Sequence, residues 1–266
     1  MAEEKFLSAQ KILIFAAGVV LGLVVGFMLT NYLNRQELER SRSETAGREP
    51  SAGGGQTAPG AGGRADGGGL SIPNLSDEEL RSAVARADAA PADADLQRTA
   101  GQALYLYSME KNNPSILPDA ARILRRAHEA DPKDYNTAVL AANASFILAR
   151  SKGDAAQLAE ARRLYERALA ERPDDAVVRT SLGLTYFYAV PPDPRRAIRE
   201  YRRALEREPR HEMALQSLTA ALIETGEFAE AERRLGELEG INASSPERQN
   251  LLAQLAQKRN AARDKP

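Results

Sequence analysis

The chain has 266 residues, a formal net charge of −1 and no cysteine. The near-neutral charge excludes a global attraction to nucleic acid, and the lack of cysteine excludes disulfides, thiolate metal sites and a cysteine nucleophile. Aromatic residues make up 5% of the chain, Trp is absent and there are two histidines. This composition favours long helices over sheets and predicts neither a metal site nor a bound cofactor.

The first organised segment is an uninterrupted apolar run over residues 12–29, which follows a short charged tail over residues 1–11. As a helix the run would be about 27 Å long, close to the hydrocarbon thickness of a bilayer. Tyr32 and Arg35 follow it as interfacial anchors. A cleavable signal peptide is the alternative, but the residues after the run offer no small-x-small cleavage site. We therefore predict an uncleaved transmembrane helix over residues 12–32.

The orientation and pairing of this span depend on its flanks and its glycines. Positive charges are about level on its two sides, so they do not fix the orientation. A short N-terminal tail before one span more often stays in the cytoplasm, which predicts an extracytoplasmic (periplasmic) domain. Gly18, Gly22 and Gly26 recur at every fourth residue and share one helix face, where two backbones could approach closely. They are candidate residues for span dimerisation, although Gly is also simply common in membrane helices.

Residues 33–69 form a polar and then glycine-rich segment, with ten glycines among the 24 residues of 46–69. Such a segment cannot bury enough apolar surface to fold, so we expect a flexible linker. Ser76-Asp-Glu-Glu79 then shows the capping-box pattern that begins a helix. We predict an N-terminal and a C-terminal capping helix, within residues 70–93 and 246–266.

A pattern of Ala, a large side chain, Ala and Pro recurs along the chain, and its prolines are 41 and 36 residues apart. The copies are Ala120…Leu124…Ala127…Pro132, Ala161…Tyr165…Ala168…Pro173 and Ala197…Tyr201…Ala204…Pro209. A unit of this length indicates stacked helix pairs, with small residues at close crossings and Pro ending the second helix. We predict pairs at 94–112 with 116–130, 135–150 with 155–171, 175–189 with 194–208, and 211–225 with 227–239.

Two further motifs, Leu182-Gly183-x-x-Tyr186 and Thr225-Gly226-Glu-Phe228-x-x-Ala231, resemble the tetratricopeptide-repeat (TPR) family when taken with the Ala-Tyr-Ala-Pro pattern. The resemblance covers residues 94–245, with extra residues around 151–155 and an insertion at 191–194. It implies an all-α solenoid of about four helix pairs plus capping helices, behind the transmembrane helix and the linker. It also implies a scaffold that binds a partner protein or extended peptide in a concave groove lined by the first helix of each pair.

The family's groove positions fall here on amide, apolar and aromatic side chains, with few charges. They are Arg98, Gln102, Tyr105 and Leu106; Asn136, Val139, Asn143, Phe146 and Ile147; Thr180, Leu184, Phe187 and Tyr188; and Met213, Gln216, Ile223 and Glu224. Val177 and Ser181 occupy places where chaperone-binding members carry the cations of a carboxylate clamp. We therefore predict an extended ligand segment with apolar side chains, and not clamp-type recognition of a C-terminal carboxylate.

Three other features do not point to a site. In the basic run over residues 195–210, Arg alternates with Glu at a spacing of four, as is typical of a solvated helix face. A patch for phosphate or acidic lipid is the alternative. His128 and His211 are predicted to be surface residues, and the glycine tract lacks the ending of a phosphate-binding loop.

The sequence thus predicts a membrane-anchored interaction scaffold, not an enzyme, with a protein or peptide partner and no nucleic acid. Assembly of an envelope or membrane complex fits this architecture, and an accessory role in cytochrome c maturation does so by analogy alone. The alternative is a structural protein that self-associates as a homodimer through the glycine face of its span.

Overall fold

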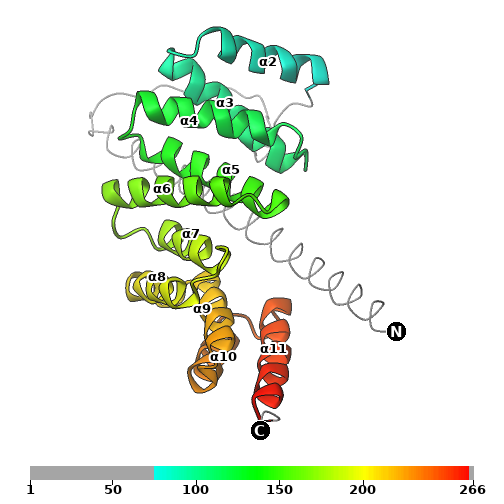
Figure 1. Cartoon of the computed structure of the whole chain (residues 1–266), viewed down its shortest axis with the longest axis vertical. Helices are drawn as coiled ribbons and strands as arrows, with labels where there is room; N and C mark the ends of the chain where they lie inside the picture. Colours follow the sequence, from blue (N-terminus) through cyan, green and yellow to red (C-terminus); the bar gives the residue numbers. More distant parts are fainter. Residues whose placement is uncertain (1–74, 264–266) are drawn as a thin grey trace, which may run out of the picture. The chain divides into compact units, whose positions relative to one another are not determined.

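The structure is a computed structural model that describes residues 75–263. Within these residues all regular structure is helical (Figure 1), which confirms the all-α prediction. The helices are α2 (Asp77–Ala89), α3 (Ala94–Glu110), α4 (Leu117–Ala130), α5 (Tyr135–Lys152), α6 (Ala155–Glu171), α7 (Ala176–Phe187), α8 (Pro194–Arg207), α9 (Glu212–Thr225), α10 (Phe228–Asn242) and α11 (Pro246–Arg263).

Residues 75–263 contain no helix with the length and apolarity needed to cross a membrane. The predicted transmembrane helix, its three glycines and the predicted linker lie outside the described residues.

The helices are arranged as consecutive pairs, α3 with α4, α5 with α6, α7 with α8 and α9 with α10. Helix α2 packs on α3 at one end of the array, and α11 packs on α9 and α10 at the other. The observed bounds of the paired helices differ from the expected ones by up to three residues. The array of helix pairs is therefore the one that the repeated pattern predicted.

Six of the ten described helices begin after a short polar side chain that caps their first turn. At α2 the predicted capping box is present, because Ser76 Oγ accepts from the Glu79 amide and the Glu79 carboxylate accepts from the Ser76 amide. Five more helices begin after an aspartate whose carboxylate accepts from backbone amides of the first turn: Asp93, Asp134, Asp154, Asp175 and Asp193. Gly153 and Gly226 end α5 and α9 with positive φ values of 67° and 79°.

The core is built from small residues that oppose large ones between the two helices of a pair. A Cβ atom on Gly183 of α7 would lie 2.4 Å from Cε1 of Tyr201 on α8, and Tyr201 is 0% exposed. In the first pair, a Cβ on Gly101 would lie 2.8 Å from Cγ of Leu124. The predicted role of Gly183 in close packing within its pair is therefore confirmed.

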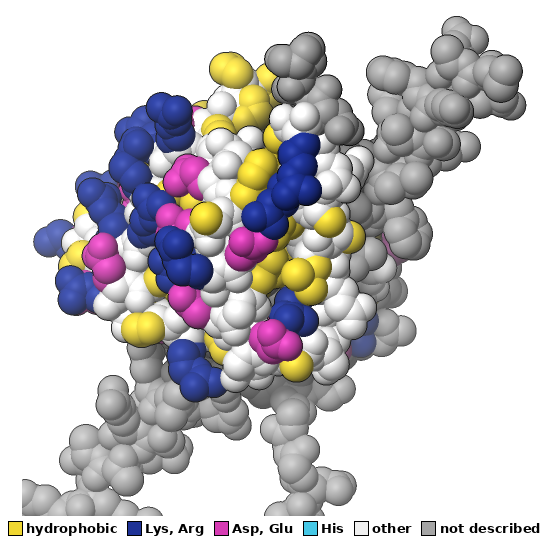
Figure 2. All heavy atoms as spheres, turned by 90° about the horizontal axis from the view of Figure 1, so that it is seen from below, with side chains coloured by type: hydrophobic (Ala, Val, Ile, Leu, Met, Phe, Trp, Pro, Cys, Tyr) yellow, Lys and Arg dark blue, Asp and Glu magenta, His cyan; other side chains and the backbone are white. Residues whose placement is uncertain are grey.

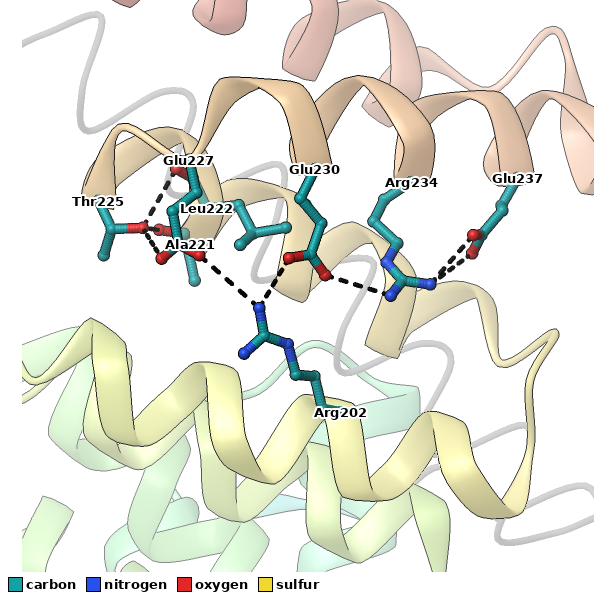
Figure 3. A network of polar contacts seen from close by, with 8 residues as sticks. All are labelled: Arg202, Ala221, Leu222, Thr225, Glu227, Glu230, Arg234 and Glu237. Atoms are coloured by element: carbon teal, nitrogen blue, oxygen red, sulfur yellow. Dashed lines mark hydrogen bonds and ion pairs between the residues drawn. The ribbon is translucent and has the colours of Figure 1, made fainter.

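The basic run on α8 pairs with residues outside this helix as well as along its own face, where Arg203 pairs with Glu200. Arg202 donates to the Glu230 carboxylate of α10 at 2.7 Å, and Arg234 donates to Glu230 at 3.2 Å and to Glu237 at 3.0 Å (Figure 3). The predicted partner of Arg202 was Glu206, four residues along the same helix. The structure instead connects the third helix pair to the fourth through this network.

Both histidines are buried, so the prediction that they are surface residues was wrong. His128 is 3% exposed and His211 is 6% exposed. Burial lowers the pKa of His128, and the charges of Arg163 and Arg167 act in the same direction, so the imidazole is neutral at pH 7. Within residues 75–263, no group of His, Cys, Asp or Glu side chains could hold a metal ion.

Candidate functional site

The candidate site is the surface formed by α3, α5, α7 and α9, which we call the first-helix face. It comprises the predicted groove residues that keep some exposure: Arg98, Gln102, Leu106, Asn136, Val139, Ile147, Phe187, Tyr188, Gln216 and Glu224. Ligand contact by these ten residues stays a prediction. They lie on every first helix of the array, as a continuous binding surface requires.

The other predicted groove residues are buried, and the structure places them in the core. They are Tyr105, Asn143, Phe146, Thr180, Leu184, Met213 and Ile223. The polar members of this group already have partners. The Asn143 amide oxygen accepts from the Tyr165 hydroxyl at 2.7 Å, and the Thr180 hydroxyl donates to the Ala176 carbonyl at 2.7 Å. These positions stabilise the array and are not available to a ligand in this structure.

Three half-buried apolar side chains recur at equivalent positions of the first three pairs, and we call them the apolar ladder. Leu106 lies on α3, Ile147 on α5 and Tyr188 at the end of α7, and each is 41 residues from the next. The equivalent position on α9 is Glu224, whose carboxylate pairs with Lys258 of α11 at 2.8 Å. The apolar ladder therefore crosses three helices and stops at the fourth.

Tyr188 is the centre of an aromatic cluster on this face. Its ring centroid lies 6.2 Å from that of Phe146 and 5.2 Å from that of Phe187, the latter edge-on. The guanidinium carbon of Arg150 on α5 lies 3.5 Å from the Tyr188 ring centroid. Burial raises the pKa of the Tyr188 hydroxyl, and the nearby Arg150 charge only partly opposes this, so the hydroxyl is protonated at neutral pH.

Sequence reasoning did not include Arg150 in the site. The available signal was its spacing, because it follows Phe146 by four residues and Ile147 by three, and so shares their helix face. The prediction ended the helix at residue 150, whereas α5 continues to Lys152. Arg150 therefore lies inside the last turn and is held against α7.

A second feature is a cleft of about 420 Å³ between α8, α9 and α10. It is lined by Leu205, Pro209, Arg210, Leu215, Arg234, Gly236, Glu237, Gly240 and Ile241. Sequence reasoning missed it as well, although Gly236 and Gly240 lie four residues apart on α10 and a Cβ on either would meet nothing within 4 Å. Arg210 donates to the Gly240 carbonyl at 3.2 Å, so the turn that precedes α9 is tied to α10 at this cleft.

Charged side chains of both signs lie together on the surface of the array. Figure 2 shows Lys and Arg side chains interspersed with Asp and Glu over the face that it presents. Many are paired, as Arg207 is with Asp174 at 2.9 Å and Arg203 with Glu200 at 3.3 Å. This mixture is typical of a solvated surface rather than of a single-sign field for nucleic acid.

Comparison with known proteins agrees with this architecture. The tetratricopeptide-repeat family model matches residues 193–255. The solved structure of the MamA RS-1 ArsTM double mutant is similar, with 18% identity, a TM-score of 0.50, and coverage of 63% of this chain and 85% of that one. No curated protein matches the chain in sequence.

Two further solved structures lie just below this level of similarity. The crystal structure of MamA protein shows 20% identity and a TM-score of 0.49, over 62% of this chain and 81% of that one. A thermophilic TPR protein of Thermus thermophilus shows 17% identity and a TM-score of 0.48, over 68% of this chain and 97% of that one.

The family match covers α8, the fourth helix pair and part of α11, and the fold extends the same arrangement over the described residues. Residues 193–255 match the TPR family, and residues 75–263 form an α-solenoid of helix pairs. Proteins built from these repeats are generally non-catalytic and serve as scaffolds for protein–protein interaction.

Proposed function

We propose that this protein is a membrane-anchored scaffold that binds a partner protein or extended peptide on its first-helix face. The observation that carries the proposal is the apolar ladder of Leu106, Ile147 and Tyr188. Its apolar side chains recur with the repeat and keep part of their surface in water, which a partner could cover. Binding would serve the assembly of an envelope or membrane complex.

The polar residues beside the apolar ladder support an extended ligand. Asn136 on α5 and Gln216 on α9 are partly exposed amides, which can both donate to and accept from a peptide backbone. Val177 and Ser181 stand where a carboxylate clamp would need cations. An extended segment with apolar side chains therefore fits this face better than a C-terminal carboxylate does.

The membrane anchor in this proposal rests on the apolar run of residues 12–29. We further propose that the array lies on the extracytoplasmic side of the membrane. Extraction of cell membranes with alkaline carbonate would test the anchor, because an integral protein stays in the pellet. A reporter fused after Pro266 that is active only in the cytoplasm would test the orientation, and its activity would contradict an extracytoplasmic domain.

Position-specific photo-crosslinking in the source cells tests the binding surface. A benzophenone side chain replaces Leu106 or Ile147 in the full chain, and a matched control carries it at Ala159, which is exposed on α6. We expect the two ladder positions to form an adduct with the same partner, and the control position to form none. Equal adducts at all three positions, or none at the ladder, would contradict the assignment of the binding surface.

A further inference from the structure

Arg150 has an arrangement that packing alone does not explain. It lies in the last turn of α5, partly exposed, and its guanidinium stacks on Tyr188 from the next first helix, 3.5 Å from the ring centroid. Within residues 75–263, the Arg150 side chain forms no hydrogen bond and no ion pair. A cation in the last turn of a helix is favoured by the helix dipole, but that preference does not require a stack on another helix.

Another stacked arginine shows what a purely structural role looks like. Arg162 lies over the Tyr186 ring at 4.3 Å and also donates to the Thr185 carbonyl at 2.9 Å and to the Thr185 hydroxyl at 3.2 Å. Its guanidinium edges are thus occupied by the protein. The edges of Arg150 are not occupied by any described residue, while its plane is fixed by the Tyr188 ring. A guanidinium held in this way is prepared to bind a carboxylate with two parallel hydrogen bonds.

We propose that Arg150 and Tyr188 form a recognition site for an Asp or Glu side chain inside an extended partner segment. Apolar side chains of the same segment, on one side of that acidic residue, occupy the ladder positions at Leu106 and Ile147. The inference rests on the proposed function and names the chemistry of its ligand. Charge complementarity selects the acidic residue, because Arg150 presents a positive charge beside Tyr188. The nearest equivalent acidic side chain, Glu224 on α9, is already paired with Lys258.

The geometry of the array also sets the spacing of the ligand. Packed helices lie about 8–10 Å apart, and the Phe146–Tyr188 contact of 6.2 Å shows that side chains of α5 and α7 meet at this face. A polyproline-II segment advances about 9 Å in three residues, and every third side chain faces the protein. The segment that fits therefore carries an apolar side chain at every third residue.

The experiment uses three peptide pools of the form Leu-x-x-Leu-x-x-Leu, acetylated and amidated so that their termini carry no charge. In each pool the x positions carry Ala, Pro or Ser, except for one variable position. That position carries Asp in the first pool, Asn in the second and Lys in the third. Binding to the full-length protein in detergent micelles is measured by competition with a fluorescent member of the Asp pool. The proteins are the wild type, Arg150→Gln, Tyr188→Leu and a control, Arg199→Gln, which removes an exposed arginine from α8.

We expect the wild type to bind the Asp pool about tenfold more tightly than the Asn pool, as a charge-assisted hydrogen-bonded pair provides. The preference should disappear in Arg150→Gln, weaken in Tyr188→Leu and persist in Arg199→Gln. The Lys pool should bind most weakly.

Several results would overturn the inference. Equal binding of the Asp and Asn pools by the wild type removes the acidic site, yet leaves the proposed function standing because the ladder still binds. An Asp preference that survives Arg150→Gln places the site elsewhere. A fourth pool, the Asn pool made with a free C-terminal carboxylate, serves as a comparison, and tight binding of that pool alone would indicate terminal recognition instead. If no pool binds, the ladder spacing is wrong, and the photo-crosslinks decide the proposed function independently.

Discussion

Replacement of Gly183 by Ala tests whether close packing within a helix pair limits the stability of the array. The added Cβ would lie 2.4 Å from Cε1 and 2.7 Å from Cδ1 of Tyr201. The Tyr201 ring is 0% exposed, so it cannot move aside without displacing its neighbours on α7 and α9. The substitution therefore forces the two helices of the third pair apart.

Two opposing effects decide the size of the change. Ala improves helix propensity over Gly by about 1 kcal/mol, while overpacking a buried contact costs about 1–3 kcal/mol. Because the clash involves a rigid ring, we take the upper half of that range and expect a net loss of about 1–2 kcal/mol in the free energy of unfolding. For a domain of this size, the loss corresponds to a fall in Tm of about 3–6 °C.

The measurement is urea and thermal unfolding of the full chain in mild detergent, followed by far-ultraviolet circular dichroism. The matched control is Gly236→Ala on α10, where a Cβ meets nothing within 4 Å. This control should gain about 0.5–1 kcal/mol, because only the helix propensity changes. The test is that the two substitutions change the free energy of unfolding in opposite directions. A Gly183→Ala variant as stable as the wild type would refute the packing argument.

The remaining predictions concern charge, pH and the span. Burial alone would raise the pKa of Glu230, but hydrogen bonds from Arg202 and Arg234 outweigh it and lower the pKa. Glu230→Gln should therefore lower the free energy of unfolding by about 1 kcal/mol at pH 7. In urea unfolding, this difference between variant and wild type should shrink as the pH falls through the lowered pKa. Because the folded pKa of His128 is depressed, the free energy of unfolding of the wild type should fall as the pH drops below about 6.5. In urea unfolding, His128→Gln should show a smaller fall in this free energy over the same pH range. Cross-linking of the span in membranes should show a dimer that Gly22→Leu weakens; no dimer in either form would exclude pairing through the glycine face.

The parts of this structure that were predictable are those that depend on neighbours close in sequence. The capping box at Ser76 and the turn at Gly226 involve residues within one or two turns, so their patterns are readable directly. A close approach at Gly183 was predictable because the repeat places small residues where the two helices of a pair cross. Short-range rules and periodicity were enough to predict the pairs.

The features that were missed depend on how successive pairs sit on one another. Asn143 has a groove position in the repeat pattern, but it is buried and accepts a hydrogen bond from Tyr165, 22 residues later. Arg202 pairs with Glu230, 28 residues away on another pair, instead of with a neighbour on its own helix. His128 is buried and lies near Arg163 and Arg167 of the following pair. A single sequence does not specify the angle between pairs, and that angle determines which groove positions stay exposed.

The attachment of α11 has a consequence for how the array comes apart. Two of its side chains, Leu251 and Leu255, are buried, and its ion pairs Lys258–Glu224 and Arg259–Glu232 are partly exposed. Salt screens such pairs, and a repeat array loses contacts with one neighbour at a time. We therefore expect opening at this end to separate α11 from α9 and α10, so that amide hydrogens of α11 exchange before those of α9 and high ionic strength speeds their exchange.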